Sequence, residues 1–287
     1  MATCFFVSDL HGSLDQYEKL FRLIGDQRPD AVFFGGDLLP SGLSALESLD
    51  FDHTDFVTDV LVVHLQRLRE DLGDTYPRVF VILGNDDSRS EEATIIAAAT
   101  TGVWQYVHDR RVAFAGHDVY GYAYVPPTPF MLKDWERYDV SRYVDPGCIS
   151  PEEGQRSVPV AEHQVRHATI QDDLASLVGT RSVDRAIFLF HSPPHDTKLD
   201  RAALDGKMID HVPLDVHVGS IAIRRLIDER QPLITLHGHI HESARITGEW
   251  SQRLGRTYCF SAAHDGPELA LVRFDTDNPG GASRSLI

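Results

Sequence analysis

The sequence is poor in cysteine, with Cys4, Cys148 and Cys259 as the only three in 287 residues. They are scattered and show no C-x-x-C spacing, which argues against a disulfide framework and against a thiolate metal site. Scarce cysteine is typical of a reducing compartment. The first residues also lack the basic segment and apolar run of a signal peptide. We therefore expect a cytoplasmic protein.

Long apolar runs and positive charge are scarce as well. No segment approaches the roughly 18 uninterrupted apolar residues that a transmembrane helix needs, so we expect no membrane association. Lys and Arg number 27 against 43 Asp and Glu, which gives a formal net charge of -16. Such a surface repels nucleic acid phosphates. The remaining composition, 42% hydrophobic and 24% charged, is that of an ordinary globular protein.

The first third of the chain alternates short apolar strands with helices. Strands are predicted at 3–7, 31–34 and 78–82, and apolar residues recur at helical spacing over 14–24 and 56–72. This alternation predicts βαβ units and a parallel sheet.

The rest of the chain is less regular. Further strands are predicted at 112–115, 119–122, 185–190, 233–236, 245–246, 257–260 and 269–274, with helices at 170–178 and 220–230. We expect one domain over 1–275, with an irregular loop or lid region at 123–165 and a frayed polar tail at 276–287. The 123–165 region is rich in aromatic residues and proline, and it forms either a lid, with Lys133 meeting a phosphate, or a plain covering loop.

Polar side chains follow five of the predicted strands. In isolation a stretch such as "LGNDDSRS" (83–90) would be an ordinary turn. Carboxyl ends of strands in an open α/β sheet, however, form the edge where ligands bind. The residues concerned are Asp9, His11, Asp37, Asn85, His191, His239 and His241. Two carboxylates and four imidazoles are costly to desolvate together, and two divalent cations would satisfy them. Ligands of oxygen and nitrogen suit Mn, Fe, Zn, Co or Ni.

The ordered set of short motifs resembles the signature of the calcineurin-like metallophosphoesterases, in the form of the small prokaryotic phosphohydrolases. The motifs are Asp9-x-His11, Gly36-Asp37, Gly84-Asn85-x-Asp87, His191 and Gly238-His239-x-His241. The resemblance implies an α/β/β/α sandwich of four layers with a dinuclear metal site. It assigns one ion to Asp9, His11, Asp37 and His241, and the other to Asp37, Asn85, His191 and His239. It also implies a hydroxide that bridges the two ions opposite Asp37 and acts as the nucleophile.

The chain departs from the family pattern at Asp86, where many members carry a histidine that protonates the leaving group or steadies the phosphate. An aspartate is ordinarily ionised at neutral pH and would repel a phosphate. Asp86 and His195 are the two candidate catalytic residues, and we favour His195 as the proton donor. His237 and His264 remain as alternatives.

The predicted function is that of a metal-dependent phosphoesterase acting on a small phosphodiester or phosphomonoester, with a nucleotide among the candidate substrates. The alternative is an interaction scaffold that uses the same fold without catalysis. Scaffolds tend to lose metal ligands, whereas this sequence has all seven. The sequence leaves open the substrate, the metal, and whether the chain forms a homo-oligomer.

Overall fold

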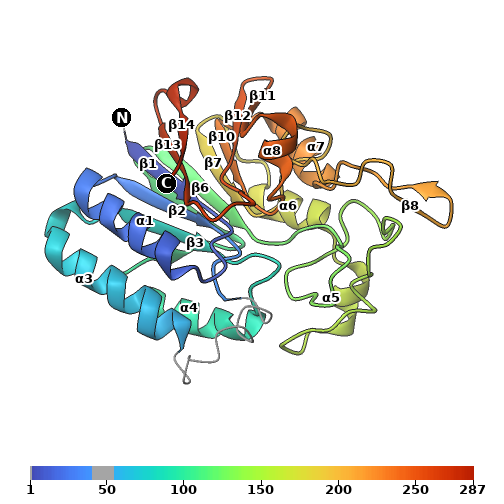
Figure 1. Cartoon of the computed structure of the whole chain (residues 1–287), viewed down its shortest axis with the longest axis horizontal. Coiled ribbons are helices and arrows are strands. Elements are labelled where there is room, and N and C mark those ends of the chain that lie inside the picture. The colour runs from blue at the N-terminus through green and yellow to red at the C-terminus, as the bar shows by residue number, and fades with distance from the viewer. Residues whose placement is uncertain (1, 41–54) are drawn as a thin grey trace.

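Two six-stranded sheets pack face to face in the computed structural model, which describes residues 2–40 and 55–287 (Figure 1). The first sheet has the order β14-β13-β1-β2-β3-β4 and the second has the order β11-β12-β10-β7-β6-β5. The strands of the first sheet are β1 Thr3–Val7, β2 Ala31–Gly35, β3 Arg78–Ile82, β4 Gln105–Tyr106, β13 Ala270–Asp275 and β14 Ser283–Leu286. Those of the second are β5 Arg110–Phe114, β6 His117–Tyr122, β7 Ala186–Phe190, β10 Ile234–His237, β11 Ser251–Leu254 and β12 Thr257–Ser261.

Helices cover the outer faces of both sheets (Figure 1). The first sheet is covered by α1 Leu14–Gln27, the π-helical η1 Phe56–Val62 with α3 Val63–Leu72, and α4 Glu92–Ala99. The second is covered by α6 Ile170–Val178 and α7 Ile221–Arg230. Shorter elements are η2 Gly73–Thr75, η3 Arg89–Glu91, α5 Glu162–His167, α8 Ser243–Thr247, η4 Pro279–Gly281 and a small hairpin of β8 Met208–Ile209 and β9 Val212–Pro213. The predicted four-layer α/β/β/α sandwich is confirmed.

Strands β1 to β4 are mutually parallel, and so are β6, β7, β10 and β12. The carboxyl ends of the parallel strands in each sheet therefore share an edge. Aromatic side chains fill the space between the sheets: Phe80 on β3 lies 4.9 Å from Phe33 and 5.5 Å from Phe114 on β5 between ring centroids. All three side chains are buried.

Local signals explain why several helices begin where they do. The Ser13 hydroxyl accepts the Gln16 backbone N–H at the start of α1, and Thr169 accepts that of Asp172 at the start of α6. Such hydroxyl caps satisfy backbone donors that the first turn of a helix leaves free. The predicted helix at 170–178 is confirmed with the same bounds.

Two expectations from the sequence are wrong, and one of the two alternatives given for the 123–165 region, a phosphate contact by Lys133, is not supported. Residues 283–286 are not frayed, because β14 pairs antiparallel with β13 at the edge of the first sheet. The strand predicted at 245–246 is instead part of α8, since a segment of two residues with one apolar side chain, Ile246, is too short to define a strand. Lys133 is fully buried and its ammonium group pairs with Glu136 at 2.5 Å, so it does not meet a ligand at the surface.

Candidate metal centre

The predicted metal ligands all follow strands that end at the common edge of the two sheets. Asp9 and His11 follow β1, Asp37 follows β2, Asn85 follows β3, His191 follows β7, and His239 and His241 follow β10. Strands β1 to β3 belong to the first sheet, and β7 and β10 belong to the second. The centre is therefore assembled from both halves of the sandwich.

Their side chains form two groups that share one carboxylate. Ligand atoms of Asp9, His11, Asp37 and His241 lie within 4.8 Å of one another, as do those of Asp37, His191 and His239. Asn85 joins the second group, because its Oδ1 lies 3.0 Å from His191 Nε2. A carboxylate common to two groups of this size is an arrangement that suits a pair of cations.

Potential metal-binding atoms of the first group lie close to one another. His11 Nε2 and His241 Nε2 lie 3.2 Å apart, and the latter also lies 3.2 Å from Asp9 Oδ1. Nitrogen and oxygen atoms that point at one small volume fit a divalent cation of the Mn-to-Zn series. The Asp9 carboxylate is held from behind by the Ser8 hydroxyl at 2.5 Å and the His239 backbone N–H at 2.9 Å.

The backbone of the centre adopts left-handed conformations at four of the seven residues. The φ angles are 58° at Asp9, 43° at His11, 53° at Asp37 and 75° at His239. Residues with a Cβ adopt positive φ only at a cost, and such conformations cluster at functional sites.

Two glycines of the motifs are explained by close approach. A Cβ atom at Gly238 would lie 2.6 Å from Asp9 Oδ2, and one at Gly84 would collide with Asp37 Oδ1. Any larger residue at either position would therefore displace the carboxylate of a predicted ligand. The sequence pairs Gly84 with Asn85 and Gly238 with His239 for this steric reason.

Charge coupling accompanies this geometry. Burial opposes ionisation of Asp9, but the hydrogen bond from His241 and the nearby histidines hold the pKa of the Asp9 carboxyl below its usual range. Burial likewise opposes a charge on His191, yet Asp37 and Asp9 raise the His191 pKa to about 9. Burial lowers the pKa of His239 to about 3. The carboxylates of Asp9 and Asp37 thus stay ionised. A bound cation would displace the protons that the neighbouring histidines carry.

Asp87 joins the tips of β2 and β3. Its carboxylate is fully buried and accepts the backbone N–H groups of Leu38, Leu39 and Gly84 at 2.8–3.2 Å. Asp87 thus binds backbone N–H groups and so supports the two strand ends, and it does not join the predicted metal ligands.

The two candidate catalytic residues lie in different surroundings. Asp86 contacts the centre directly, since its Oδ2 lies 3.2 Å from His11 Nδ1. The His195 Nε2 lies 3.6 Å from Asp215, and its ring packs near that of His217. Neither of these partners belongs to the predicted ligand set.

The two alternative histidines are both engaged elsewhere. His237 is buried with Nδ1 bound to the Ser192 carbonyl and Nε2 bound to Thr235, so neither nitrogen is free for a substrate. His264 pairs with Glu268 at 3.0 Å.

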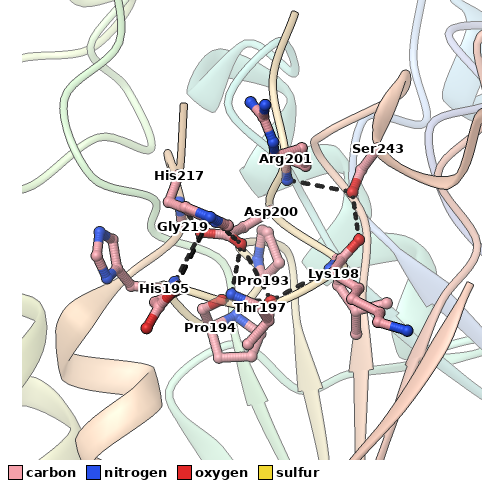
Figure 2. A network of polar contacts seen from close by, with 12 residues as sticks. Pro193, Pro194, His195, Thr197, Lys198, Asp200, Arg201, His217, Gly219 and Ser243 are labelled. Atoms are coloured by element: carbon pink, nitrogen blue, oxygen red, sulfur yellow. Dashed lines mark hydrogen bonds and ion pairs between the residues drawn. The ribbon is translucent and has the colours of Figure 1, made fainter. Parts of the chain in front are cut away.

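A polar network centred on Asp200 holds the loop that follows His191 (Figure 2). The buried Asp200 carboxylate accepts the backbone N–H groups of Thr197 and Gly219 and lies 2.9 Å from His217 Nδ1. The Ser243 hydroxyl extends the network by donating to the Lys198 carbonyl at 2.8 Å. Ser243 lies two residues after the predicted ligand His241. No sequence motif marks this network, because Asp200 lies in a loop without a recognisable pattern.

Residues 3–243 match the calcineurin-like phosphoesterase family. The chain belongs to this family. As a metallophosphoesterase it is a hydrolase of phosphoric esters, and its family usually binds divalent metals. No helix in residues 2–40 and 55–287 is long and apolar enough to cross a membrane.

Solved metallophosphoesterase structures share the fold. Protein TT1561 of Thermus thermophilus is 17% identical, with 99% of this chain and 98% of that chain covered and a TM-score of 0.53. A dimetal phosphatase from Danio rerio is 13% identical over 95% and 91% of the two chains, with a TM-score of 0.50. Phosphopantetheinyl hydrolase from Mycobacterium tuberculosis is 11% identical over 91% and 89%, with a TM-score of 0.52. The comparison with curated proteins finds no match.

Proposed function

We propose that the protein hydrolyses a small phosphodiester or phosphomonoester with the help of two divalent cations. One observation carries the proposal: two groups of ligand atoms, each within 4.8 Å, share the Asp37 carboxylate. Asp9, His11, Asp37 and His241 would hold one cation. Asp37, Asn85, His191 and His239 would hold the other. When bound, such a pair lowers the pKa of a water and withdraws charge from a phosphoryl group.

The residues of the chain would act by holding and orienting. His191 is suited to its role because its Nδ1 lies 2.8 Å from the Gly35 carbonyl, which leaves Nε2 directed at Asn85 and Asp37. A histidine whose other nitrogen is bound in this way offers one defined lone pair to a metal. Asn85 supplies a neutral oxygen, which limits the negative charge that a phosphate would meet.

A diester is the favoured substrate class within this proposal. The Asp86 side chain is 41% exposed beside the first ligand group. Its carboxylate would repel a phosphomonoester, which carries up to two negative charges, more strongly than a diester with one. The histidine that many relatives use at this position would have the opposite effect.

His195 remains our proposed proton donor to the leaving group. It lies on the loop that follows the ligand His191, and the Asp200 network holds that loop (Figure 2). The substitution His195→Ala should slow cleavage of esters with alkyl leaving groups and spare p-nitrophenyl esters, which need no proton. His264→Ala is the matched control, because its ring pairs with Glu268 instead. Equal losses on both kinds of ester would contradict this role.

Metal content and turnover together test the proposed function. Protein loaded separately with Mn, Fe, Zn, Co or Ni should bind two ions per chain and cleave bis-p-nitrophenyl phosphate, p-nitrophenyl phosphate or a nucleotide. Asp37→Asn should reduce both metal content and activity, because both ligand groups lose their shared charge. Metal-replete protein that cleaves none of these esters would favour the scaffold alternative. The molecular mass of the protein in solution, compared with the mass of one chain, would test for a homo-oligomer.

A further inference from the structure

The two nitrogen atoms of His11 face different partners. Nε2 lies 3.2 Å from His241 Nε2 and 4.0 Å from Asp37 Oδ2, within the first ligand group. Nδ1, on another edge of the ring, lies 3.2 Å from Asp86 Oδ2. A carboxylate accepts only, so this contact requires a hydrogen on Nδ1. The lone pair of the neutral ring then resides on Nε2, which faces the ligand group.

We propose that Asp86 is a positioning residue that fixes the tautomer and the ring orientation of His11, so that Nε2 is presented to a cation. This inference rests on the proposed metal centre. The aspartate thus occupies the position of the usual histidine but serves the metal rather than the leaving group.

His191 provides an internal comparison. Its Nδ1 is bound to the Gly35 carbonyl at 2.8 Å, and its Nε2 faces the second ligand group. Both histidines therefore combine an oxygen acceptor on Nδ1 with an Nε2 that faces other predicted ligands. Acceptors of this kind commonly orient metal-binding histidines and raise their basicity. His11 differs in that a side chain supplies the acceptor, so a substitution can remove it.

The side chain and backbone of residue 86 have separable roles. The backbone N–H of Asp86 donates to Asp37 Oδ1 at 2.8 Å, and this bond survives any substitution other than proline. The side chain is 41% exposed, so shortening it opens no buried cavity. A side-chain variant consequently reports on the contact with His11 and leaves the support of Asp37 in place.

Mn²⁺ binding to the full-length protein tests the proposal. We expect two Mn²⁺ sites in the wild type, and Asp86→Ala should weaken one of them by about 10- to 100-fold. Asp86→Asn keeps an oxygen acceptor for Nδ1 and should restore that site close to the wild-type affinity. Glu268→Ala is the matched control, because Glu268 pairs with a histidine outside the ligand set and is similarly exposed at 47%.

The possible outcomes separate this inference from the proposed function. Wild-type protein that binds no Mn²⁺ would overturn the metal centre and the inference with it. Wild-type protein with two sites, both unchanged in Asp86→Ala, would overturn the inference alone. An Asp86→Asn variant as weak as Asp86→Ala would also contradict it, since the contact would then act through charge and not through the tautomer. Matching melting temperatures of the metal-free proteins exclude misfolding as the cause.

Discussion

The carboxylate of Asp87 lies 2.9 Å from the backbone nitrogen of Leu38, and so it ties the end of β3 to the end of β2. It binds the backbone N–H of Leu39 at 2.8 Å as well. Asp37 immediately precedes this pair and Asn85 lies two residues before Asp87. One buried side chain therefore sets the spacing between residues of both ligand groups.

Removing the Asp87 carboxylate should destabilise the fold. Asp87→Ala leaves three backbone N–H groups without their acceptor, at a cost of about 3 kcal/mol or more in the free energy of unfolding. Asp87→Asn retains one oxygen acceptor and should lose less. Urea unfolding of the two variants measures the difference. Equal stability of Asp87→Ala and the wild type would show that water replaces the carboxylate.

The close approach at Gly84 predicts that even a methyl group there disrupts the centre. In Gly84→Ala the new Cβ meets Asp37 and, at 2.7 Å, His191 Cε1, so ligands of both groups must move. A displacement of about 1 Å can cost 100-fold in rate, and we expect a loss of kcat/KM of at least that order. Metal content should fall in parallel.

Gly25→Ala is the control for the glycine experiment. Gly25 lies inside α1, where a Cβ would make an ordinary contact of 3.7 Å with Leu68. Alanine is the better helix residue by roughly 0.5–1 kcal/mol, so this variant should keep full activity and gain stability. Similar activity losses in both glycine variants would argue against a specific effect at Gly84.

The charge of Asp86 should influence the choice between esters. Asp86→Asn removes the negative charge and keeps the acceptor for His11, so it should raise kcat/KM for phosphomonoesters relative to diesters by roughly fivefold, or ~1 kcal/mol. The effect is modest because the side chain is exposed, and added salt should reduce it. Kinetics on p-nitrophenyl phosphate and its bis ester measure the ratio. An unchanged ratio would mean that the substrate lies far from this carboxylate.

The buried ring of His108 predicts a loss of stability in acid. Burial, together with Arg89, Arg137 and Arg110, lowers the His108 pKa to about 3, and Nδ1 accepts the Ala123 backbone N–H at 3.0 Å. In the unfolded chain this histidine titrates near pH 6.5, at about its ordinary pKa. Between pH 6.5 and 3 the unfolded state binds the additional proton. The free energy of unfolding should therefore decrease as the pH is lowered from 6.5 to 3, by up to about 1.4 kcal/mol per pH unit from this group.

His108→Gln isolates that contribution. Glutamine keeps an acceptor for Ala123 but does not titrate, so unfolding free energies of the variant should depend less steeply on pH below 6.5. His237, whose pKa burial lowers to about 4, acts in the same direction and remains in both proteins. Identical slopes for variant and wild type would mean that His108 gains a proton within the fold.

The residue pattern was sufficient to predict a parallel sheet and the ligand-type residues at its edge, whereas the four-layer sandwich followed from the family resemblance. Apolar strands alternate with helices, and a polar motif directly after a strand must lie at the sheet edge. Asp9 and His239, 230 residues apart, were expected to meet on this basis, and the His239 backbone does bind Asp9.

Other features depend on packing that no short pattern encodes. The sequence shows Lys133 three residues before Glu136 but not that both are buried, and this burial removes Lys133 from any role at the surface. Asp86 and His11 are 75 residues apart in the sequence, and their contact depends on the orientation of the His11 ring in the folded protein. The pairing of residues 283–286 with β13 depends on an edge that only the assembled sheet provides.

The aromatic layer between the sheets has a consequence for the edge that carries the predicted metal ligands. Ligands from residues 9–85 belong to one sheet and those from residues 191–241 to the other, so the thickness of the layer around Phe33, Phe80 and Phe114 sets how far apart the two ligand sets stand. Sheets packed face to face are separated by about 10 Å, and a smaller or larger core residue changes that separation. If the proposed centre binds metal, its selectivity should therefore respond to substitutions in the hydrophobic interior that touch none of the predicted ligands.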